Sequence, residues 1–270
     1  MLVSYEVLED FSKLIKTKSC NDFERDLKVG VDLGTANIVI SVVDSKNTPI
    51  AGVTYPSTVV KDGIVVDFIG AIKILKEQKS FLENMVGKEL LFAATAVPPG
   101  ITEGNKKCIA NVVEGAGFEV KKVVDEPTAA AQVLNISDGA VVDVGGGTTG
   151  ISILKNGKVI FTADEPTGGI HMTLTLAGYY GISIEEAEKI KTDTSRERDV
   201  FQIVKPVVQK MASIVGRFLN GFDVDTIYVV GGAACFSEFE NVFEKELGIK
   251  TIKPNEPLLV TPLGIAFLLD

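Results

Sequence analysis

Two aspartates stand in the same local pattern, each at the end of an apolar run and directly before a glycine turn. Asp32 follows VGV and precedes LGTAN, while Asp143 follows AVV and precedes VGGGTTG. A second β-branched run comes after each turn. Backbone N–H groups in glycine turns bind phosphate oxygens, and carboxylates attract Mg²⁺. The repeated pattern therefore predicts a clamp that holds the phosphates of a nucleotide from two sides, with Mg²⁺ between the two acids.

The small and hydroxyl-bearing residues of the two turns are the candidate phosphate contacts. Glycine lets the backbone press against phosphate, and threonine hydroxyls donate hydrogen bonds to it. Either turn alone is weak evidence, because such sequences often only reverse the chain, but two copies in the same register favour a site. The candidates are Gly34, Thr35, Ala36 and Asn37 in the first turn and Gly145, Gly146, Gly147 and Thr148 in the second.

Three further segments carry groups that could face a nucleotide. Glu126 comes directly before a proline at the end of a predicted buried strand, where its carboxylate could reach a cleft. The run GGAA at 231–234 follows another strand and leaves a flat surface that suits adenine. Glu188 and Lys191 lie on one face of a predicted helix. Each segment also has a simpler explanation: a helix-start acid, a packing joint and a surface ion pair, respectively.

Composition and charge are those of a soluble globular protein. The chain has 270 residues, 46% of them hydrophobic and 23% charged, and its formal net charge is −9. This acidity argues against nucleic-acid binding, because no basic surplus exists to neutralise phosphates along a duplex. No run is long and apolar enough to span a bilayer, and the Met1–Cys20 segment lacks the apolar centre of a signal peptide. We therefore predict a cytoplasmic protein that contacts neither nucleic acid nor membrane.

The cysteine and histidine content excludes several kinds of site. Cys20, Cys108 and Cys235 are odd in number and far apart, so neither a disulfide framework nor a zinc site is predicted, and each is expected to pack as a small apolar residue. His171 is the single histidine, which removes any site that needs several imidazoles. A catalytic base there stays formally open, although a place in the loop or helix after Gly169 is the simpler expectation.

Hydrophobic periodicity predicts two related rounds of strands and helices after an amphipathic N-terminal helix. The first round has strands at 29–34, at 37–44 and from 49, a helix at 67–86, a strand at 90–97, a helix at 100–116, and a strand and short helix over 119–131. The second has strands over 140–163 around an Asn156-Gly157 hairpin turn, helices after 169, at 184–191 and at 204–221, a strand at 226–230, a helix at 236–247, a strand at 249–252 and a helix at 262–269.

This order predicts two α/β lobes with mixed sheets and a ligand cleft between them. We divide the chain into an N-terminal helical extension (1–28), a first lobe (29–137) and a second lobe (138–270), with helix 262–269 a candidate to pack back on the first lobe. The extension either caps the first sheet or docks a partner, and packing on its own body is the default expectation.

The order of the motifs resembles that of the actin-like ATPase superfamily. DLGTAN, DEPTAAA, DVGGGTTG, AEKIK and VVGGAA are similar to its five nucleotide-site segments, and the likeness covers almost everything after residue 28. VGVDLGTANIVISVVD, KDGIVVDFIGA, the segment around His171 and VTPLGIA further resemble the EutJ family, chaperone-like proteins of ethanolamine-utilisation operons. The resemblance implies a two-lobed, ribonuclease-H-like α/β fold with duplicated mixed sheets, here with the insertion subdomains reduced or missing.

The resemblance also implies roles for individual residues. Asp32 and Asp143 would hold Mg²⁺ through water from opposite lobes, and Glu126 would position the water that attacks ATP, so these three are the candidate catalytic residues. The two turns would hold the phosphates. The other candidate cofactor contacts are Gly168 and Gly169, then Glu188 and Lys191 at the ribose, and Gly231, Gly232 and Ala233 at the adenine.

The chain departs from the family pattern in three places. Heat-shock chaperones of the superfamily carry a phosphate-contacting lysine in an insertion of the first lobe; only residues 52–63 could correspond here, and we find no equivalent lysine. The second insertion is reduced to TDTSRERD, between the AEKIK helix and a helix starting near Val204. After Gly169, where many relatives have acidic residues, this chain has Ile170, His171, Met172 and Thr173. These departures put ATP hydrolysis in question and leave ATP binding as the expectation.

The implied function is a compact ATP-binding switch of ethanolamine utilisation. Its lobes would close on Mg·ATP, and its surface would engage ethanolamine ammonia-lyase or another component of the bacterial microcompartment. Three alternatives stay open: a pseudo-ATPase scaffold or adaptor without turnover, a small-molecule kinase, and a filament protein like MreB or FtsA. A kinase would need a substrate pocket that lobe insertions commonly build, and any ATPase activity is expected to be weak.

Overall fold

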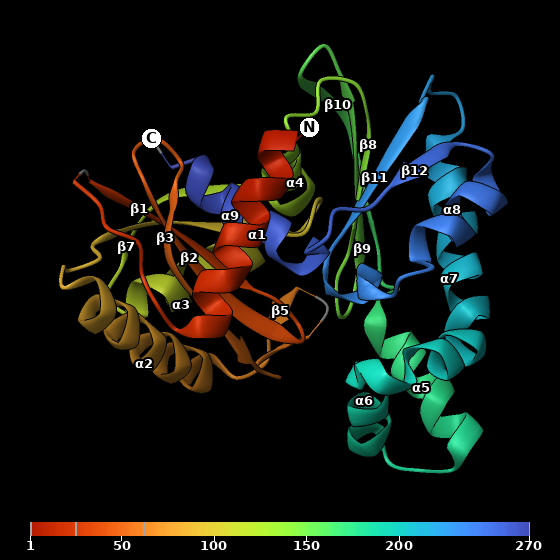
Figure 1. Cartoon of the computed structure of the whole chain (residues 1–270), viewed down its shortest axis with the longest axis horizontal. Coiled ribbons are helices and arrows are strands. Elements are labelled where there is room, and N and C mark those ends of the chain that lie inside the picture. Colours follow the sequence, from red (N-terminus) through yellow and green to blue (C-terminus); the bar gives the residue numbers. More distant parts are fainter. Residues whose placement is uncertain (1, 25, 62, 270) are drawn as a thin grey trace.

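The computed structural model describes residues 2–24, 26–61 and 63–269, so the predicted domain limits at residues 1 and 270 lie outside the described residues. Two five-stranded sheets stand side by side, with helices on their outer sides (Figure 1). The sheets have equivalent strand orders, β3-β2-β1-β6-β7 and β10-β9-β8-β11-β12. The chain therefore uses one α/β plan twice, as the repeated sequence pattern predicts.

The first half begins as an antiparallel meander and continues in parallel. β1 pairs with β2 antiparallel and with β6 parallel, because a helix-containing connection returns the chain to the same direction. The strands are β1 (Leu27–Leu33), β2 (Asn37–Asp44), β3 (Pro49–Pro56), β6 (Phe92–Val97) and β7 (Glu119–Asp125). Helices α2 (Phe68–Val86) and α3 (Glu103–Gly115) cover this sheet. Asp67 caps α2 by accepting from the backbone N–H of Gly70.

The segment that could correspond to the insertion of the first lobe is short. Its described residues hold the end of β3 and the short strand β4 (Val60–Lys61), which pairs with β5 (Ile64–Val65) just after the segment as a separate two-stranded sheet. The compact form predicted for this region is what the structure has.

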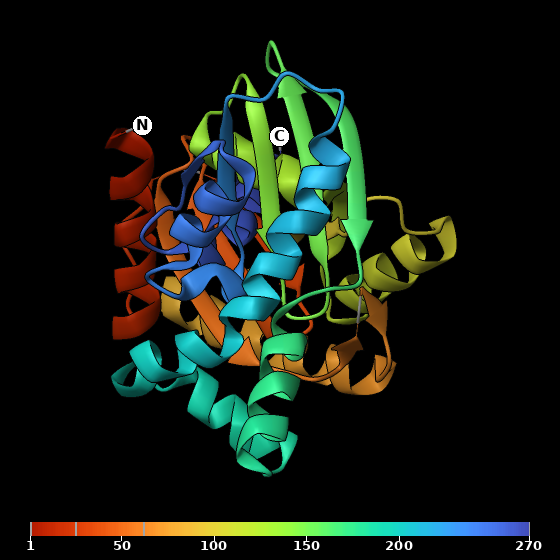
Figure 2. The same ribbon diagram turned by 90° about the vertical axis from the view of Figure 1, so that its right-hand side faces the viewer.

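The second half repeats the plan. Its strands are β8 (Gly139–Val144), β9 (Thr149–Lys155), β10 (Lys158–Glu165), β11 (Thr226–Val230) and β12 (Lys250–Ile252). Asn156 and Gly157 both have positive φ, as a two-residue hairpin turn requires. The helices are α5 (Gly169–Tyr180), α6 (Ile184–Thr192), α7 (Glu197–Leu219) and α8 (Phe239–Leu247), with short 3₁₀ turns at Thr194–Arg196 and Gly232–Cys235. Figure 2 shows α7 running across the face of this sheet.

Two central helices join the halves. α4 (Glu126–Leu134) and α9 (Pro257–Phe267) pack against each other between the sheets, and α9 also packs on β1, β2 and β6 of the first sheet (Figure 1). A side chain at Gly264 would collide with the backbone carbonyl of Ala129, so only glycine allows the helices to approach so closely here. The Ser41 hydroxyl donates to the Pro262 carbonyl at 2.6 Å and ties α9 to β2.

The N-terminal helix α1 (Leu2–Thr17) packs on the first sheet beside β3. Leu8, Phe11 and Leu14 are buried, which is the face that the helical periodicity predicts. Its polar side reaches the other half of the chain, because Ser12 and Lys16 both donate to Glu256 Oε1, at 2.7 and 2.8 Å. The expectation that the extension packs on its own body therefore holds, and it also touches the segment before α9.

Several expected elements differ in the structure. α7 starts at Glu197 rather than near Val204, so Pro206 lies inside the helix and not in its first turn. α9 starts at Pro257 rather than at 262, and Pro262 lies inside it. Both errors have one cause: an internal proline was read as a helix start, whereas packing of an apolar face compensates for the backbone hydrogen bond that proline removes.

Two further expectations about burial are wrong. β7 is the edge strand of its sheet and alternates between exposed and partly buried residues, so Glu126 does not follow a buried strand. Cys20 and Cys235 are exposed and Cys108 is partly buried, so the cysteines are not packed in the core. Among the described residues no helix is long and apolar enough to cross a membrane.

Candidate functional site

A cavity of about 330 Å³ lies between the two halves, where the ends of β1 and β8 approach each other. The first turn (residues 33–37) and the second turn (residues 144–149) form opposite parts of its wall. The second turn also contacts the first directly, because a side chain at Gly146 would lie 3.1 to 3.2 Å from atoms of Thr35 and Ala36. The predicted cleft is therefore present, and the two turns meet at its floor.

The structure brings almost all predicted site residues to this cavity. Gly168 is the exception, because it lies beneath the second turn: a side chain there would meet the backbone of residues 145–147 at 2.7 to 2.8 Å. It supports the wall rather than forming it. The predicted residues that line the cavity are Asp32, Gly34, Thr35, Ala36, Asn37, Glu126, Asp143, Gly145, Gly146, Gly147, Thr148, Gly169, Glu188, Lys191, Gly231, Gly232 and Ala233.

Backbone hydrogen bonds fix the second turn. The N–H of Gly145 donates to the carbonyl of Thr148 at 2.9 Å. The first N–H groups of α5, from Gly169 and Ile170, donate to the carbonyls of Gly145 and Gly146 at 2.9 and 2.8 Å. Because these carbonyls are turned toward α5, the turn is held in one conformation from behind.

His171 takes the structural role that the sequence favoured. Its Nδ1 accepts from the backbone N–H of Gly168 at 3.3 Å, at the start of α5. The side chain therefore satisfies a backbone donor that the helix start leaves without an intrahelical partner, and it does not line the cavity.

The carboxylates of Asp32, Asp143 and Glu126 line the cavity near the two turns, and burial disfavours the ionisation of all three. Burial and the nearby Asp143 raise the pKa of Asp32 to about 7, and burial raises the pKa of Asp143 to about 6. Burial, together with the charges of Asp143 and Asp32, raises the pKa of Glu126 well above its usual range. Asp32 and Glu126 keep part of their surface open to the cavity, so water or a cation there favours their ionised forms.

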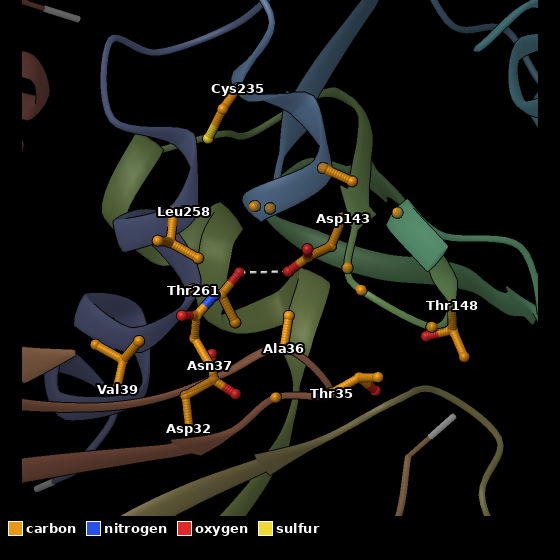
Figure 3. A pocket seen from close by; sticks show the side chains of 18 of the residues that line it. Asp32, Thr35, Ala36, Asn37, Val39, Asp143, Thr148, Cys235, Leu258 and Thr261 are labelled. Carbon is orange, nitrogen blue, oxygen red and sulfur yellow. Dashed lines mark hydrogen bonds between the residues drawn. The ribbon is translucent and has the colours of Figure 1, made fainter. Parts of the chain in front are cut away.

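Asp143 is the carboxylate with the firmest support. It is 7% exposed, and its Oδ2 accepts a hydrogen bond from the hydroxyl of Thr261 on α9 (Figure 3). Its other oxygen lies against Gly231, where any side chain would collide with it. Among the described residues, by contrast, we find no hydrogen bond to the side chain of Asp32.

Glu188 and Lys191 form a partly buried network at the cavity wall rather than a simple surface pair. Lys191 Nζ lies 2.7 Å from Glu188 Oε2 and 2.8 Å from Thr173 Oγ1. It also donates to the carbonyl of Gly169 at 3.3 Å, next to the second turn. Lys191 is the only basic residue among the described residues that line the cavity, and Lys61, in the shortened insertion, does not line it.

Sequence reasoning missed part of the wall. Thr261 and Leu258 come from α9, which was expected to begin after both residues; Thr261 lies in VTPLGIA, a string that supported the family resemblance but was given no role at the site. Cys235 and Phe236 follow the predicted glycine pair and could have been found by extending that segment. The other missed residues are Leu33, Val39, Val60, Gly63, Pro98, Met172, Thr192, Asp193, Thr194 and Glu197.

The donors at the cavity fit Mg²⁺ bound together with phosphate. They are carboxylate oxygens, which are hard ligands, and a bound cation would offset the burial and mutual repulsion that raise the pKa values of Asp32 and Glu126. Within the described parts of the chain, no group of three or more His, Cys, Asp or Glu side chains is arranged to hold a metal alone. A magnesium ion that keeps several waters and shares phosphate oxygens needs no such group.

Relatives of known assignment cover most of the chain. It is 43% identical over 244 residues to the ethanolamine utilization protein EutJ of Escherichia coli K12, covering 90% of this chain and 86% of that protein. The EutJ of Salmonella typhimurium LT2 is 43% identical over 241 residues, covering 89% and 85%. The chain belongs to the EutJ family.

A solved EutJ structure has the same fold throughout. The crystal structure of EutJ from Carboxydothermus hydrogenoformans is 48% identical, covers 98% of both chains, and gives a TM-score of 0.94. The resemblance of the sequence to this family is therefore confirmed, and the chain is a EutJ-family protein of ethanolamine utilisation with an actin-like fold.

More distant structures share the fold alone. MreB5 of Spiroplasma citri bound to AMPPNP has a TM-score of 0.71 at 19% identity, covering 90% of this chain and 95% of that chain. The PilM–PilN type IV pilus biogenesis complex has a TM-score of 0.75 at 14% identity, covering 90% and 98%. The sequence model of the type IV pilus assembly protein PilM also matches residues 130–257. The EutJ-family chain is thus one of several proteins built on the actin-like ATPase plan.

Proposed function

We propose that this EutJ-family chain binds Mg·ATP in the cavity between its halves and acts as a nucleotide-dependent switch on a protein of ethanolamine utilisation. The observation that carries the proposal is the meeting of two acid-and-glycine turns at one cavity, whose lining includes the carboxylates of Asp32, Asp143 and Glu126. MreB5, which shares the fold, is a nucleotide-bound protein in its solved structures.

In this proposal each lining group has a simple task. The N–H groups of Gly146 and Gly147 in the second turn, which α5 fixes from behind, would donate to phosphate oxygens, and Thr35 and Thr148 would add hydroxyl donors. Bound Mg²⁺ would offset the charge of the triphosphate. Asp32 and Asp143 would hold waters of that ion from opposite sides, and their ionised forms would then be favoured by the nearby positive charge.

The ribose and base would lie toward α6 and α9. Glu188 is oriented by Thr173 and Lys191, so its carboxylate has a fixed position from which to accept from ribose hydroxyls. Gly232, Ala233 and Leu258 would provide an apolar surface for adenine, because they expose no polar side-chain group to a flat ring.

Partner binding completes the switch. PilM, which shares the fold, forms a complex with PilN. For a switch to work, the ATP-bound and ATP-free forms must differ in affinity for the partner. We propose ethanolamine ammonia-lyase or a component of the bacterial microcompartment as that partner, which places the chain in the cytoplasm or at the microcompartment.

Calorimetry tests the nucleotide part of the proposal. The wild-type chain should bind ATP more tightly with Mg²⁺ than with EDTA, and Asp143→Ala should remove measurable Mg·ATP binding while the circular dichroism spectrum stays unchanged. Glu103→Ala, on the exposed start of α3, is the matched control and should bind as the wild type does. Unchanged ATP affinity in Asp143→Ala contradicts the clamp.

The partner part needs a separate experiment. The tagged wild-type chain and Asp143→Ala would be used for pull-down from cells induced on ethanolamine, each with and without Mg·ATP. We expect the capture of one partner to depend on ATP in the wild type and not in the variant. Capture that is the same in all four samples argues against a switch.

A second function, an adaptor that binds ATP without hydrolysing it, is favoured by the lack of a lysine equivalent to the one that contacts phosphate in heat-shock chaperones. In the ligand-free chain, burial and neighbouring acids also raise the pKa of Glu126, so hydrolysis would depend on bound Mg²⁺ to favour its ionised form. The wall also offers no lysine other than Lys191 among the described residues. Phosphate release measured at saturating Mg·ATP distinguishes the two functions, because an adaptor releases none above background.

A further inference from the structure

Thr261 is a buried hydroxyl at the cavity that the predicted site does not include. It is 4% exposed, lies in the second turn of α9, and donates to Asp143 Oδ2 (Figure 3). A buried helical threonine commonly returns its hydroxyl to the carbonyl four residues earlier. Here that carbonyl, of Pro257, accepts from the N–H of Gly231 at 2.9 Å. The hydroxyl of Thr261 is thus directed to the acid.

The helix α9 that carries Thr261 is held in place by contacts with the first half of the molecule. The Ser41 hydroxyl donates to the carbonyl of Pro262, and the backbone at Gly30 lies directly against α9, since a side chain there would be 2.7 Å from the same carbonyl. Gly264 lies directly on α4 at Ala129. These contacts anchor α9 on the first sheet, whereas Asp143 belongs to the second sheet.

We propose that Thr261 is the positioning residue of the second acid: its hydroxyl fixes the orientation of the Asp143 carboxylate from the first half of the molecule. This inference rests on the proposed function, because the orientation matters only if Asp143 holds a water of a magnesium ion bound with nucleotide. With Oδ2 engaged by Thr261 and Oδ1 against Gly231, the carboxylate has one available orientation. A hydrogen bond to a charged group is stronger than a neutral one, so the bond supports the ionised acid.

Two substitutions at this position separate the hydroxyl from the side-chain shape. Thr261→Val keeps the branched shape and removes the donor, and Thr261→Ser keeps the donor. Calorimetry of each variant with ATP in Mg²⁺ and with ATP in EDTA measures how much the metal adds to affinity. In Thr261→Val we expect the increase in ATP affinity caused by Mg²⁺ to be about tenfold smaller than in the wild type, while the affinity in EDTA is unchanged. In Thr261→Ser we expect this increase to stay within about threefold of the wild-type value.

Ser41→Ala is the matched control. It removes a hydroxyl that ties α9 to β2 without contacting Asp143 or the cavity, so a purely structural loosening of α9 appears there too. We expect its magnesium-dependent gain to equal that of the wild type. An equal loss in Ser41→Ala and Thr261→Val overturns the positioning role and indicates packing alone.

The outcomes for this inference and for the proposed function are distinguishable. If the wild type binds Mg·ATP and Thr261→Val shows the same magnesium-dependent gain, only the inference fails. If the wild type does not bind ATP, the proposed function fails and the inference with it. Circular dichroism checks folding, and Thr261→Ala serves in place of Thr261→Val if the valine variant does not fold. A magnesium-dependent gain equal to the wild-type value in Thr261→Ala would also contradict the positioning role of Thr261.

Discussion

The two acid-and-glycine turns stand at equivalent places in the two halves, yet the protein supports them differently. The second turn is held from behind by the first N–H groups of α5, and its acid is held by Thr261. The first turn receives a backbone hydrogen bond from Ser57 to the carbonyl of Ala36, at 3.0 Å, and its acid has the higher pKa, about 7. The first turn therefore has fewer constraints on its position than the second.

The difference shows that two halves with the same strand order can have different roles. The second half supplies a fixed wall, because a turn with satisfied carbonyls and an oriented acid needs no rearrangement when a ligand arrives. The first half gains its support elsewhere, from α1, which covers β3 and has no counterpart in the described part of the second half. Substitutions in the two supports should therefore have separable effects on stability and on binding.

Removing the support of the first half should have the largest effect on stability. The ring of Phe11 is fully buried and fills the space above Gly52. Phe11→Ala should lower the free energy of unfolding by roughly 3 to 5 kcal/mol in urea denaturation. ATP affinity should change little at temperatures where the variant is folded, because α1 does not line the cavity. The control Lys13→Ala, on the exposed face of α1, should leave stability unchanged. A loss of ATP affinity in Phe11→Ala would show that the support of the first half affects binding as well as stability.

Disturbing the support of the second turn should affect binding as well. A methyl group at Gly168 meets the backbone of all three glycines of the turn, which cannot move aside as a flexible side chain can. Gly168→Ala should cost roughly 2 to 3 kcal/mol of stability and lower ATP affinity by about tenfold or more. Gly178→Ala, inside α5 and with open space around it, should instead be neutral or stabilising by up to about 1 kcal/mol. Unaltered ATP affinity in Gly168→Ala would show that the turn does not need its support.

The difference between the acids should appear in the pH dependence of stability. A folded-state pKa of about 7 for Asp32, against a usual value of 3.8, means that the folded protein binds this proton more tightly than the unfolded one. The resulting stabilisation is present below about pH 4 and is lost as the pH rises to about 7. Asp32→Asn should therefore stabilise the ligand-free protein at about pH 8 by roughly 2 kcal/mol, and by little at about pH 4.

Asp143→Asn should give a smaller gain than Asp32→Asn. Its pKa is lower, about 6, and the amide loses the charge-assisted hydrogen bond from Thr261. Urea denaturation of both variants at the two pH values checks the order. A larger gain at Asp143 than at Asp32 would reverse our comparison of the two acids.

The smallest effect is expected where α1 touches the segment before α9. Glu256 accepts from Ser12 and from Lys16, whose side chain is 69% exposed. Glu256→Gln should cost about 0.5 kcal/mol or less, because exposed ion pairs contribute little and the amide can still accept from Ser12. Raising the salt concentration should shrink the difference further. A cost above about 2 kcal/mol would mean that this contact contributes more to the free energy of unfolding than exposed ion pairs usually do.

The sequence by itself determined the duplicated plan and most of the cavity wall. Period-two and helical patterns located the strands and most helices, since a side chain's face follows from its local spacing. The two turns, Glu126 and the segment at 231–233 were found because glycine and carboxylate residues at strand ends carry a local signal. Lys191 and Glu188 were found from their spacing on one face of a predicted helix, but their network with Thr173 was not predicted.

Tertiary structure alone decided what depends on pairs distant in the chain. Pro206 and Pro262 were misread because packing, not local propensity, keeps a helix intact across a proline. The raised pKa values of Asp32, Asp143 and Glu126 arise from burial and mutual proximity, which no single segment contains. The bond from Thr261 to Asp143 joins residues more than a hundred positions apart, and it exists because α9 is anchored on the sheet of the other half.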